Sequence, residues 1–404
     1  MSSTFWLMNA RLESGFEVEQ GVVIGTRTEL AHLLIQDGAI AKMIPSSEII
    51  YDELPQKDAK QMLILPSFIE KHCHLDKTLL GDRWRAVTPV RSIFERLAIE
   101  KNTLPAVETP TKQRAEKLLD IYQKSGVTHV RTHVDIYPEI GLTNLEAVKE
   151  ALHTFEGKLS HEIVAFPQHG LFASKDLLRE ALRQGAGFIG GVDPATVDGD
   201  IEASLQLMVE LAVEGDAGID LHLHDPDHLG VFTMKRLAQL TKEAGLQGKV
   251  SVSHAYALGD IPLAQAEALA EVLADAGISI ITSVPIDRKF PPVGLLDQKG
   301  VPVSVACDNI FDVWSPFGNG DLLERASRLA EVSGWVDERA LAKTLSYITG
   351  GRTPLNYQGE QIWPRVGDVA NLVVVEASCS AEAVARRSKR IATMYQGEVV
   401  AGEL

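Results

Sequence analysis

Residues 218–255, GIDLHLHDPDHLGVFTMKRLAQLTKEAGLQGKVSVSHA, decide the fold, because two short apolar runs flank one amphipathic stretch. The runs at 218–225 and 249–255 each contain polar or ionisable side chains toward their ends. Between them, residues 232–244 repeat apolar side chains at the spacing of a helix that buries one face. A buried strand, a helix and a second buried strand in this order predict a parallel βαβ unit.

The same order of runs and helical patterns recurs along the middle of the chain. Further helical patterns lie at residues 142–155, 174–184 and 264–276. The apolar runs give eight candidate strands, at residues 62–72, 127–135, 162–168, 187–193, 218–225, 249–255, 278–284 and 302–308. Eight parallel strands are the number that closes a (β/α)₈ or TIM barrel. We therefore predict an α/β fold with a TIM barrel over residues 64–353, and an active site where the strands end.

The two ends of the chain show a different pattern. Residues 1–63 and 354–404 contain short alternating runs separated by Gly, Asp and Pro, which indicates strands joined by turns. We expect the two ends to pair into one small sheet domain. Residues 81–110 form a long insertion after the first barrel strand, so we expect a lid or a pocket wall there.

Composition narrows the class of partner. The 404 residues include 39 Lys and Arg against 55 Asp and Glu, a formal net charge of −16. This charge repels phosphate backbones and anionic lipids, so neither a nucleic acid nor a membrane is an expected partner. Three cysteines at wide spacing match neither a disulfide framework nor a zinc motif, and the N-terminal stretch has no secretory pattern. We expect a cytoplasmic protein.

The sharpest local motif is KHCHLDK at residues 71–77, which contains His72 and His74. Side chains two positions apart on a strand point to the same side, so both imidazoles can reach one ion. The alternative is a pair of barrel-core histidines satisfied by hydrogen bonds, since so short a motif also matches by chance. The motif therefore needs support from other strands.

Three further strand ends supply that support. His222 lies in the fifth run, His254 in the sixth and Asp308 in the eighth. Imidazole is a common ligand of zinc and iron, and a catalytic site keeps few protein ligands so that water can bind. The Asp308 carboxylate can bind the ion and accept a proton from water, whereas His254 can bind the ion or donate a proton. Barrel geometry brings all strand ends to one axis, so we expect a metal site there.

Several longer segments are specific to one group of enzymes. They include PSFIEKHCHLDKT at 66–78, GVTHVRTHVD at 126–135, IDLHLHDPDHLGV at 219–231 and ACDNIFDVWSPFGNGD at 306–321. Over nearly the whole length the chain resembles the amidohydrolase superfamily, in the branch of cytosine deaminase and N-isopropylammelide isopropylaminohydrolase. The resemblance implies a TIM barrel with a small β-sandwich built from residues 1–63 and 354–404. It also implies hydrolysis of carbon–nitrogen bonds with one bound divalent metal ion, zinc or iron.

The resemblance also assigns roles to residues. It gives four metal ligands, which are His72, His74, His222 and Asp308. His254 matches a histidine beside the metal, and Gln168 matches a position that recognises the substrate ring. Asp193 stands where binuclear relatives carry a bridging lysine, so one metal ion is expected. Cytosine deaminase has a proton-shuttling glutamate where this chain has Asp225, one methylene shorter, which favours a related ring-amine hydrolysis over cytosine deamination.

We therefore expect a hydrolase that attacks a ring carbon bearing an amino or alkylamino group in an aminopyrimidine, pterin or s-triazine. The expected catalytic side chains are Asp308, His254 and Asp225. Gln168 and Asn309 are expected to orient the ring, and Trp314 to supply an apolar wall. The alternatives are an amidohydrolase of a cyclic or acyclic amide and a catalytically silent barrel that only binds a ligand. The expected partner is a small heterocyclic molecule, with a homo-oligomer as a further option.

Overall fold

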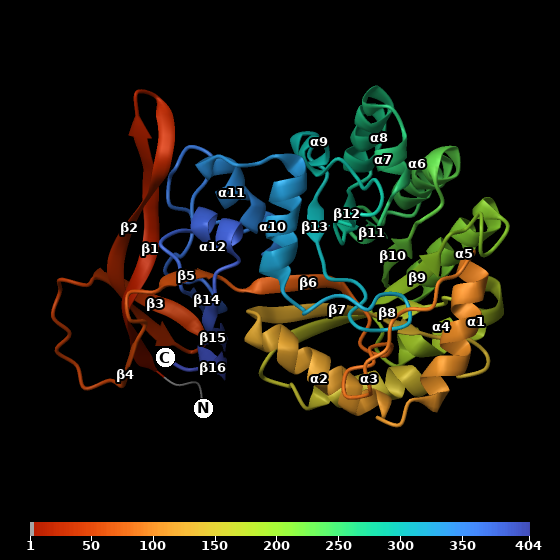
Figure 1. Cartoon of the computed structure of the whole chain (residues 1–404), viewed down its shortest axis with the longest axis horizontal. Helices are drawn as coiled ribbons and strands as arrows, with labels where there is room; N and C mark the ends of the chain where they lie inside the picture. Colours follow the sequence, from red (N-terminus) through yellow and green to blue (C-terminus); the bar gives the residue numbers. More distant parts are fainter. Residues whose placement is uncertain (1–3) are drawn as a thin grey trace.

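The structure of the protein, a computed structural model, describes residues 4–404 and contains two sheets (Figure 1). In one sheet all neighbouring strands are parallel and follow the order of the chain. Its strands are β6 (Phe68–Cys73), β7 (Val127–Asp135), β8 (Ser160–Phe166), β9 (Phe188–Val192), β10 (Gly218–His222), β11 (Val250–Ser253), β12 (Ile278–Thr282) and β13 (Val303–Val305).

The parallel sheet closes on itself where its first and last strands meet. Asp308, just after β13, donates its backbone N–H to the carbonyl of His72 on β6 at 2.8 Å. Cys73 and Asp308 also form a parallel bridge. The (β/α)₈ barrel that the eight runs predict is therefore confirmed, and the closure places residues 72 and 308 side by side.

Helices cover the outside of the barrel (Figure 1). They are α1 (Ile93–Thr103), η1 (Leu104–Ala106), α2 (Thr111–Lys124), α3 (Thr143–His153), α4 (Leu171–Arg183), α5 (Ile201–Glu214), α6 (Asp227–Glu243), α7 (Ala257–Asp260), α8 (Leu263–Asp275), α9 (Val293–Gln298), α10 (Leu322–Ser333), α11 (Glu338–Thr344) and η2 (Leu345–Ile348). Local sequence sets their ends: in α10 the Asp321 side chain accepts hydrogen bonds from the first backbone N–H groups, and Gly334 ends the helix at φ +67°. Among residues 4–404, none of the helices has both the length and the apolar character that a bilayer crossing requires.

The second sheet joins the two ends of the chain. It contains β1 (Phe5–Glu19), β2 (Val22–Gln36), β3 (Ala39–Pro45), β4 (Gln56–Asp58), β5 (Leu63–Pro66), β14 (Leu372–Val375), β15 (Arg390–Tyr395) and β16 (Glu398–Gly402). The short helix α12 (Ser380–Arg386) connects β14 to β15. Phe5, Leu33 and Trp363 belong to a core separate from that of the barrel. The expected pairing of both chain ends in a second, mixed sheet is confirmed.

The run at residues 62–72 differs from the single barrel strand that its apolar character predicts. The structure divides it at Ser67 into β5 and β6. β5 pairs with β14 in the second sheet, with Leu65 opposite Val373, whereas β6 pairs with β7 in the barrel. Because Pro66 has no N–H to donate, the chain can leave one sheet here and enter the other. The run is thus two strands that join the two sheets.

Candidate active site

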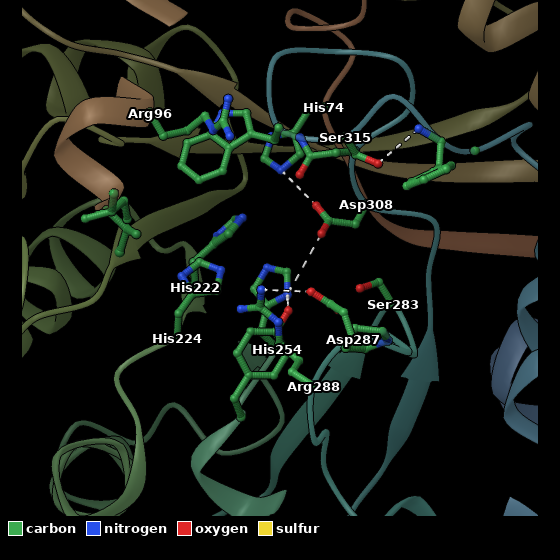
Figure 2. A pocket seen from close by; sticks show the side chains of 18 of the residues that line it. His74, Arg96, His222, His224, His254, Ser283, Asp287, Arg288, Asp308 and Ser315 are labelled. Carbon is green, nitrogen blue, oxygen red and sulfur yellow. Dashed lines mark hydrogen bonds and ion pairs between the residues drawn. The ribbon is translucent and has the colours of Figure 1, made fainter. Parts of the chain in front are cut away.

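Five polar side chains converge at the C-terminal mouth of the barrel (Figure 2). They are His72 on β6, His74 just after it, His222 at the end of β10, His254 after β11 and Asp308 after β13. Asp308 Oδ1 lies 3.3 Å from His72 Nε2 and 3.4 Å from His74 Nε2, and its Oδ2 lies 4.0 Å from His254 Nδ1. The ring centroids of His72 and His222 are 4.5 Å apart. The structure brings every residue predicted as a metal ligand to one point.

The donor atoms of this cluster suit a divalent cation. His72, His74 and Asp308 offer ligand atoms within 4.8 Å of one another, and so do His72, His222 and His254. His72 Nε2, His74 Nδ1 and both ring nitrogens of His222 are buried without a hydrogen-bond partner among the described residues. Buried polar atoms ordinarily have a partner, and imidazole nitrogens with a carboxylate are the ligands of zinc and iron. The residues therefore fit the metal ion that the fold family uses.

The protonation states also suit metal binding. Burial lowers the pKa of His74 to about 4, and it lowers the pKa values of His222 and His254 well below the ordinary value. These imidazoles are therefore neutral at pH 7. Burial alone would raise the pKa of Asp308, but His254, His72 and His74 hold it well below the ordinary value. Neutral imidazoles and an ionised carboxylate are the forms that bind a cation.

The backbone is strained where these strands end. Asp193, His254 and Asp308 adopt φ values of +40°, +69° and +61°, which L-residues rarely take. Each such residue costs on the order of 1–3 kcal/mol and persists only where the surrounding structure fixes it. The three residues follow β9, β11 and β13, so the strain is concentrated around the metal cluster.

The His72 ring is held from behind by residues that the sequence interpretation missed. Its Nδ1 lies 2.8 Å from Ser253 Oγ, and Ser253 donates to Asp220 Oδ1 at 2.7 Å. Arg131 donates to the other oxygen of Asp220 at 2.9 Å. Because the Ser253 hydroxyl donates to Asp220, it accepts from His72 Nδ1–H, which leaves Nε2 with a free lone pair toward the metal cluster. The signal in the sequence was Asp220, an acidic residue within an otherwise apolar strand.

A second pair, His224 and Asp193, stands beside His254. His224 Nδ1 lies 2.9 Å from Asp193 Oδ2, and the rings of His224 and His254 are 4.4 Å apart. Burial would lower the pKa of His224, but the Asp193 carboxylate raises it above the ordinary value. The sequence interpretation gave Asp193 only a minor role and gave none to His224. The pair places a protonatable imidazole at the cavity wall.

Asp225 lines the cavity but has close partners of its own. Its carboxylate accepts hydrogen bonds from the Ala195 N–H at 3.0 Å and from the Thr196 hydroxyl. Burial raises its pKa above the ordinary value, against the effect of Thr196. The shorter side chain thus contacts the turn after β9.

The metal cluster opens into a cavity of about 1200 Å³. Gln168, Asn309 and Trp314, predicted as substrate-binding residues, all line it. Asn309 donates to Asp312 Oδ2 at 2.6 Å, which fixes its amide. Residues 90–94 and Arg96, from the insertion at 81–110, line the same cavity. Together with helix α1 they make the insertion a wall of the pocket.

A barrel with histidines and an aspartate at its strand ends defines a class of metal-dependent hydrolases. The family model described as "Amidohydrolase family" matches residues 111–401. The chain therefore belongs to the amidohydrolase family, and the expectation of a hydrolase acting on carbon–nitrogen bonds other than peptides is confirmed.

Individual relatives agree with this family. The chain is 40% identical to the uncharacterized protein YahJ of Escherichia coli K12, over 99% of this chain and 88% of that one. It is 32% identical to N-isopropylammelide isopropyl amidohydrolase of Pseudomonas sp. strain ADP, over 85% of this chain and 87% of the relative.

Solved structures give the same result. The N-isopropylammelide isopropylaminohydrolase of Burkholderia multivorans superposes with a TM-score of 0.86 at 28% identity, covering 99% of both chains. The 5-methylcytosine deaminase of Klebsiella pneumoniae, solved with 5-fluorocytosine, gives 0.81 at 26% identity, covering 99% of this chain and 98% of that one. Each relative with a stated activity in these comparisons hydrolyses or deaminates a nitrogen heterocycle, so a small-molecule substrate is supported.

Proposed function

We propose that the protein hydrolyses an exocyclic carbon–nitrogen bond on a nitrogen heterocycle, releasing ammonia or an alkylamine. One divalent metal ion, zinc or iron, is held by four side chains: His72, His74, His222 and Asp308. The observation that carries this proposal is the set of neutral, unpartnered imidazole nitrogens around an ionised carboxylate. A bound divalent ion supplies a nucleophile at neutral pH, because it lowers the pKa of water from 15.7 to about 7.

The residues of the chain then handle the protons. Asp308 accepts a proton from the attacking water, since its carboxylate is ionised and lies among the metal ligands. Water oxygen bonds to the ring carbon, the exocyclic bond breaks, and the amine leaves with a proton delivered from the protein. His254 lies 4.0 Å from Asp308 and faces the same cavity, so it stabilises the developing charge and passes the proton on.

His224 and Asp225 support the proton transfer from the rim. The Asp193 carboxylate favours a protonated His224, whose ring is 4.4 Å from His254, so His224 can resupply His254. Asp225 holds the turn that carries Asp193's neighbours through Ala195 and Thr196. We assign Asp225 to the proton pathway in place of the longer glutamate of cytosine deaminase.

The cavity sets the substrate class. Gln168 and Asn309 present amide groups, and Trp314 presents an indole ring, which suits a flat heterocycle with polar edges. The names of the relatives cover an s-triazine derivative, a pterin and 5-methylcytosine. We therefore infer an aminopyrimidine, pterin or s-triazine as substrate. The three cysteines are buried and unpaired, which suits a reducing compartment, and we place the enzyme in the cytoplasm.

The experiment is a turnover screen of these three substrate classes with protein supplied with Zn²⁺ or Fe²⁺, following amine release. Asp308→Ala is expected to lower kcat by at least about a hundredfold, because it removes both a metal ligand and the base. Asp287→Asn, an exposed carboxylate at the same cavity, is the control and should stay near wild type. An unchanged kcat in Asp308→Ala would contradict the mechanism, and hydrolysis of simple amides alone would favour the amide alternative.

A further inference from the structure

Glu100 connects three residues of the cavity although it does not line the cavity itself. It lies on α1, in the insertion at 81–110, and is 2% exposed. Its Oε1 accepts from Gln168 Nε2 at 2.7 Å and lies 3.5 Å from Lys77 Nζ. Its Oε2 accepts from the Trp314 indole N–H. Three segments that are remote in the sequence thus meet on one buried carboxylate.

These contacts fix the orientation of the Gln168 amide. An ionised carboxylate only accepts hydrogen bonds, so Gln168 must turn its NH₂ group toward Glu100. The Lys77 ammonium beside the same oxygen is another donor and reinforces this orientation. The Gln168 carbonyl oxygen then points elsewhere, and it has no hydrogen-bond donor among residues 4–404 while Gln168 lines the cavity. The amide offers the substrate an acceptor.

We propose that Glu100 is a positioning residue that makes Gln168 a hydrogen-bond acceptor and so selects heterocycles with a ring N–H at that edge. A ring that lacks this N–H leaves the Gln168 oxygen unpaired in a dry pocket, which disfavours binding. The inference rests on the proposed function, because it concerns the same cavity and substrate class.

Glu100→Gln separates this role from simple packing. The new amide has one oxygen and one NH₂ group, whereas Gln168 and Trp314 both present donors to position 100. The indole cannot exchange its N–H for an acceptor, but the Gln168 amide can flip. The flip turns the Gln168 NH₂ group toward the substrate and removes the acceptor.

Selectivity is measured as the ratio of kcat/KM for a substrate to that for its ring-N-methyl derivative. N-isopropylammelide and 5-methylcytosine, each with its singly methylated forms, are the probes. Wild type is expected to favour the N–H form at one ring position by at least about tenfold. In Glu100→Gln this ratio is expected to fall about tenfold, mainly through a higher KM for the N–H form. A ratio that stays constant would indicate exclusion by the size of the methyl group and would overturn the proposal.

A second variant tests the same logic by rescue. Trp314→Phe removes the indole donor, so in Glu100→Gln/Trp314→Phe the residue-100 oxygen can turn back to Gln168. The selectivity of the double variant should recover to that of Trp314→Phe alone. Glu95→Gln, an exposed position on the same helix, is the control and should retain wild-type selectivity. Failure of the rescue would overturn the proposal.

A measurement without turnover separates this inference from the proposed function. In protein labelled with ¹⁵N-glutamine, one Gln168 side-chain amide proton should exchange slowly in wild type and rapidly in Glu100→Gln, with Gln168→Met identifying the signal. Rapid exchange of both protons in wild type would overturn the inference. Slow exchange with no turnover of any heterocycle would overturn the proposed function and leave the orientation of Gln168 established.

Discussion

Ser253 shows how a residue outside the metal cluster controls a ligand. Its hydroxyl accepts from His72 Nδ1 and donates to Asp220, so it fixes both the tautomer and the orientation of the His72 ring. Partners of this kind tune the metal affinity of the ligand they hold. The effect is measurable without any substrate.

Ser253→Ala is expected to weaken metal binding by about 10- to 100-fold, because His72 loses the partner that sets its tautomer. Competition with a chromophoric chelator measures the affinity. Ser279→Ala is the matched control, because Ser279 is also a barrel serine but bonds to Ser251 instead of a ligand. Equal metal affinity in Ser253→Ala and wild type would show that the hydrogen bond does not matter.

The sequence predicts the metal cluster better than the residues around it. His72, His74, His222 and Asp308 follow recognisable apolar strands, so the barrel alone places them together. Glu100 could not be found in this way, because it lies in an insertion and its partners are distant in sequence. Hydrogen-bond partners across separate segments depend on tertiary packing, which a local pattern does not carry.

At the scale of elements, β1 and α12 meet on a buried carboxylate. Glu13 of β1 is 1% exposed and accepts a hydrogen bond from the Ser380 N–H at the start of α12. Its Oε2 has no hydrogen-bond partner among the described residues. Burial raises the pKa of Glu13 from 4.5 to about 7. The folded protein therefore prefers this carboxyl group protonated.

Glu13→Gln is expected to stabilise the protein at pH 8 but not at pH 4.5. In wild type the unfolded chain ionises Glu13 freely above pH 4.5, while the folded chain resists ionisation up to about pH 7, so stability falls across that range. The difference corresponds to about 3 kcal/mol of unfolding free energy. Thermal unfolding at both pH values tests it, with exposed Glu17→Gln on the same strand as control. A parallel pH dependence in Glu13→Gln and wild type would contradict it.

Predicting elements from apolar runs fails where two sheets meet. The eight barrel runs appear as strands because each is buried and bounded by turns, yet residues 62–72 hold two strands. An apolar run reports burial and not which sheet buries it. Only the pairing partners, β14 for β5 and β7 for β6, distinguish the two.

At the scale of the whole molecule, metal binding is coupled to folding. The ligands come from β6, β10 and the segment after β13, so an ion that binds them binds the folded state and not the unfolded chain. Removing the ion with a chelator is expected to lower Tm and abolish activity, and added Zn²⁺ should restore both. A thousandfold excess over Kd adds about 4 kcal/mol. Asp308→Ala should show a smaller Zn²⁺-dependent shift, and an equal shift would place the ion elsewhere.

The overall architecture is the part that the sequence predicts best. Barrel strands and the amphipathic helices between them have distinct periods, so their alternation identifies a parallel barrel. The second sheet was expected only as a pairing of the two ends, because its order, with β5 between β1 and β14, depends on long-range contacts. Such contacts have no local signature.

The hydrogen bond between Asp308 and His72 that closes the barrel also orders events during synthesis. A ribosome makes the histidines of the first strand long before the aspartate of the last. Until residue 308 has left the ribosome, the nascent chain has neither a closed barrel nor a complete set of ligands. Acquisition of the metal ion therefore falls near the end of translation, and an mRNA truncated before this codon yields a chain that has no competent site.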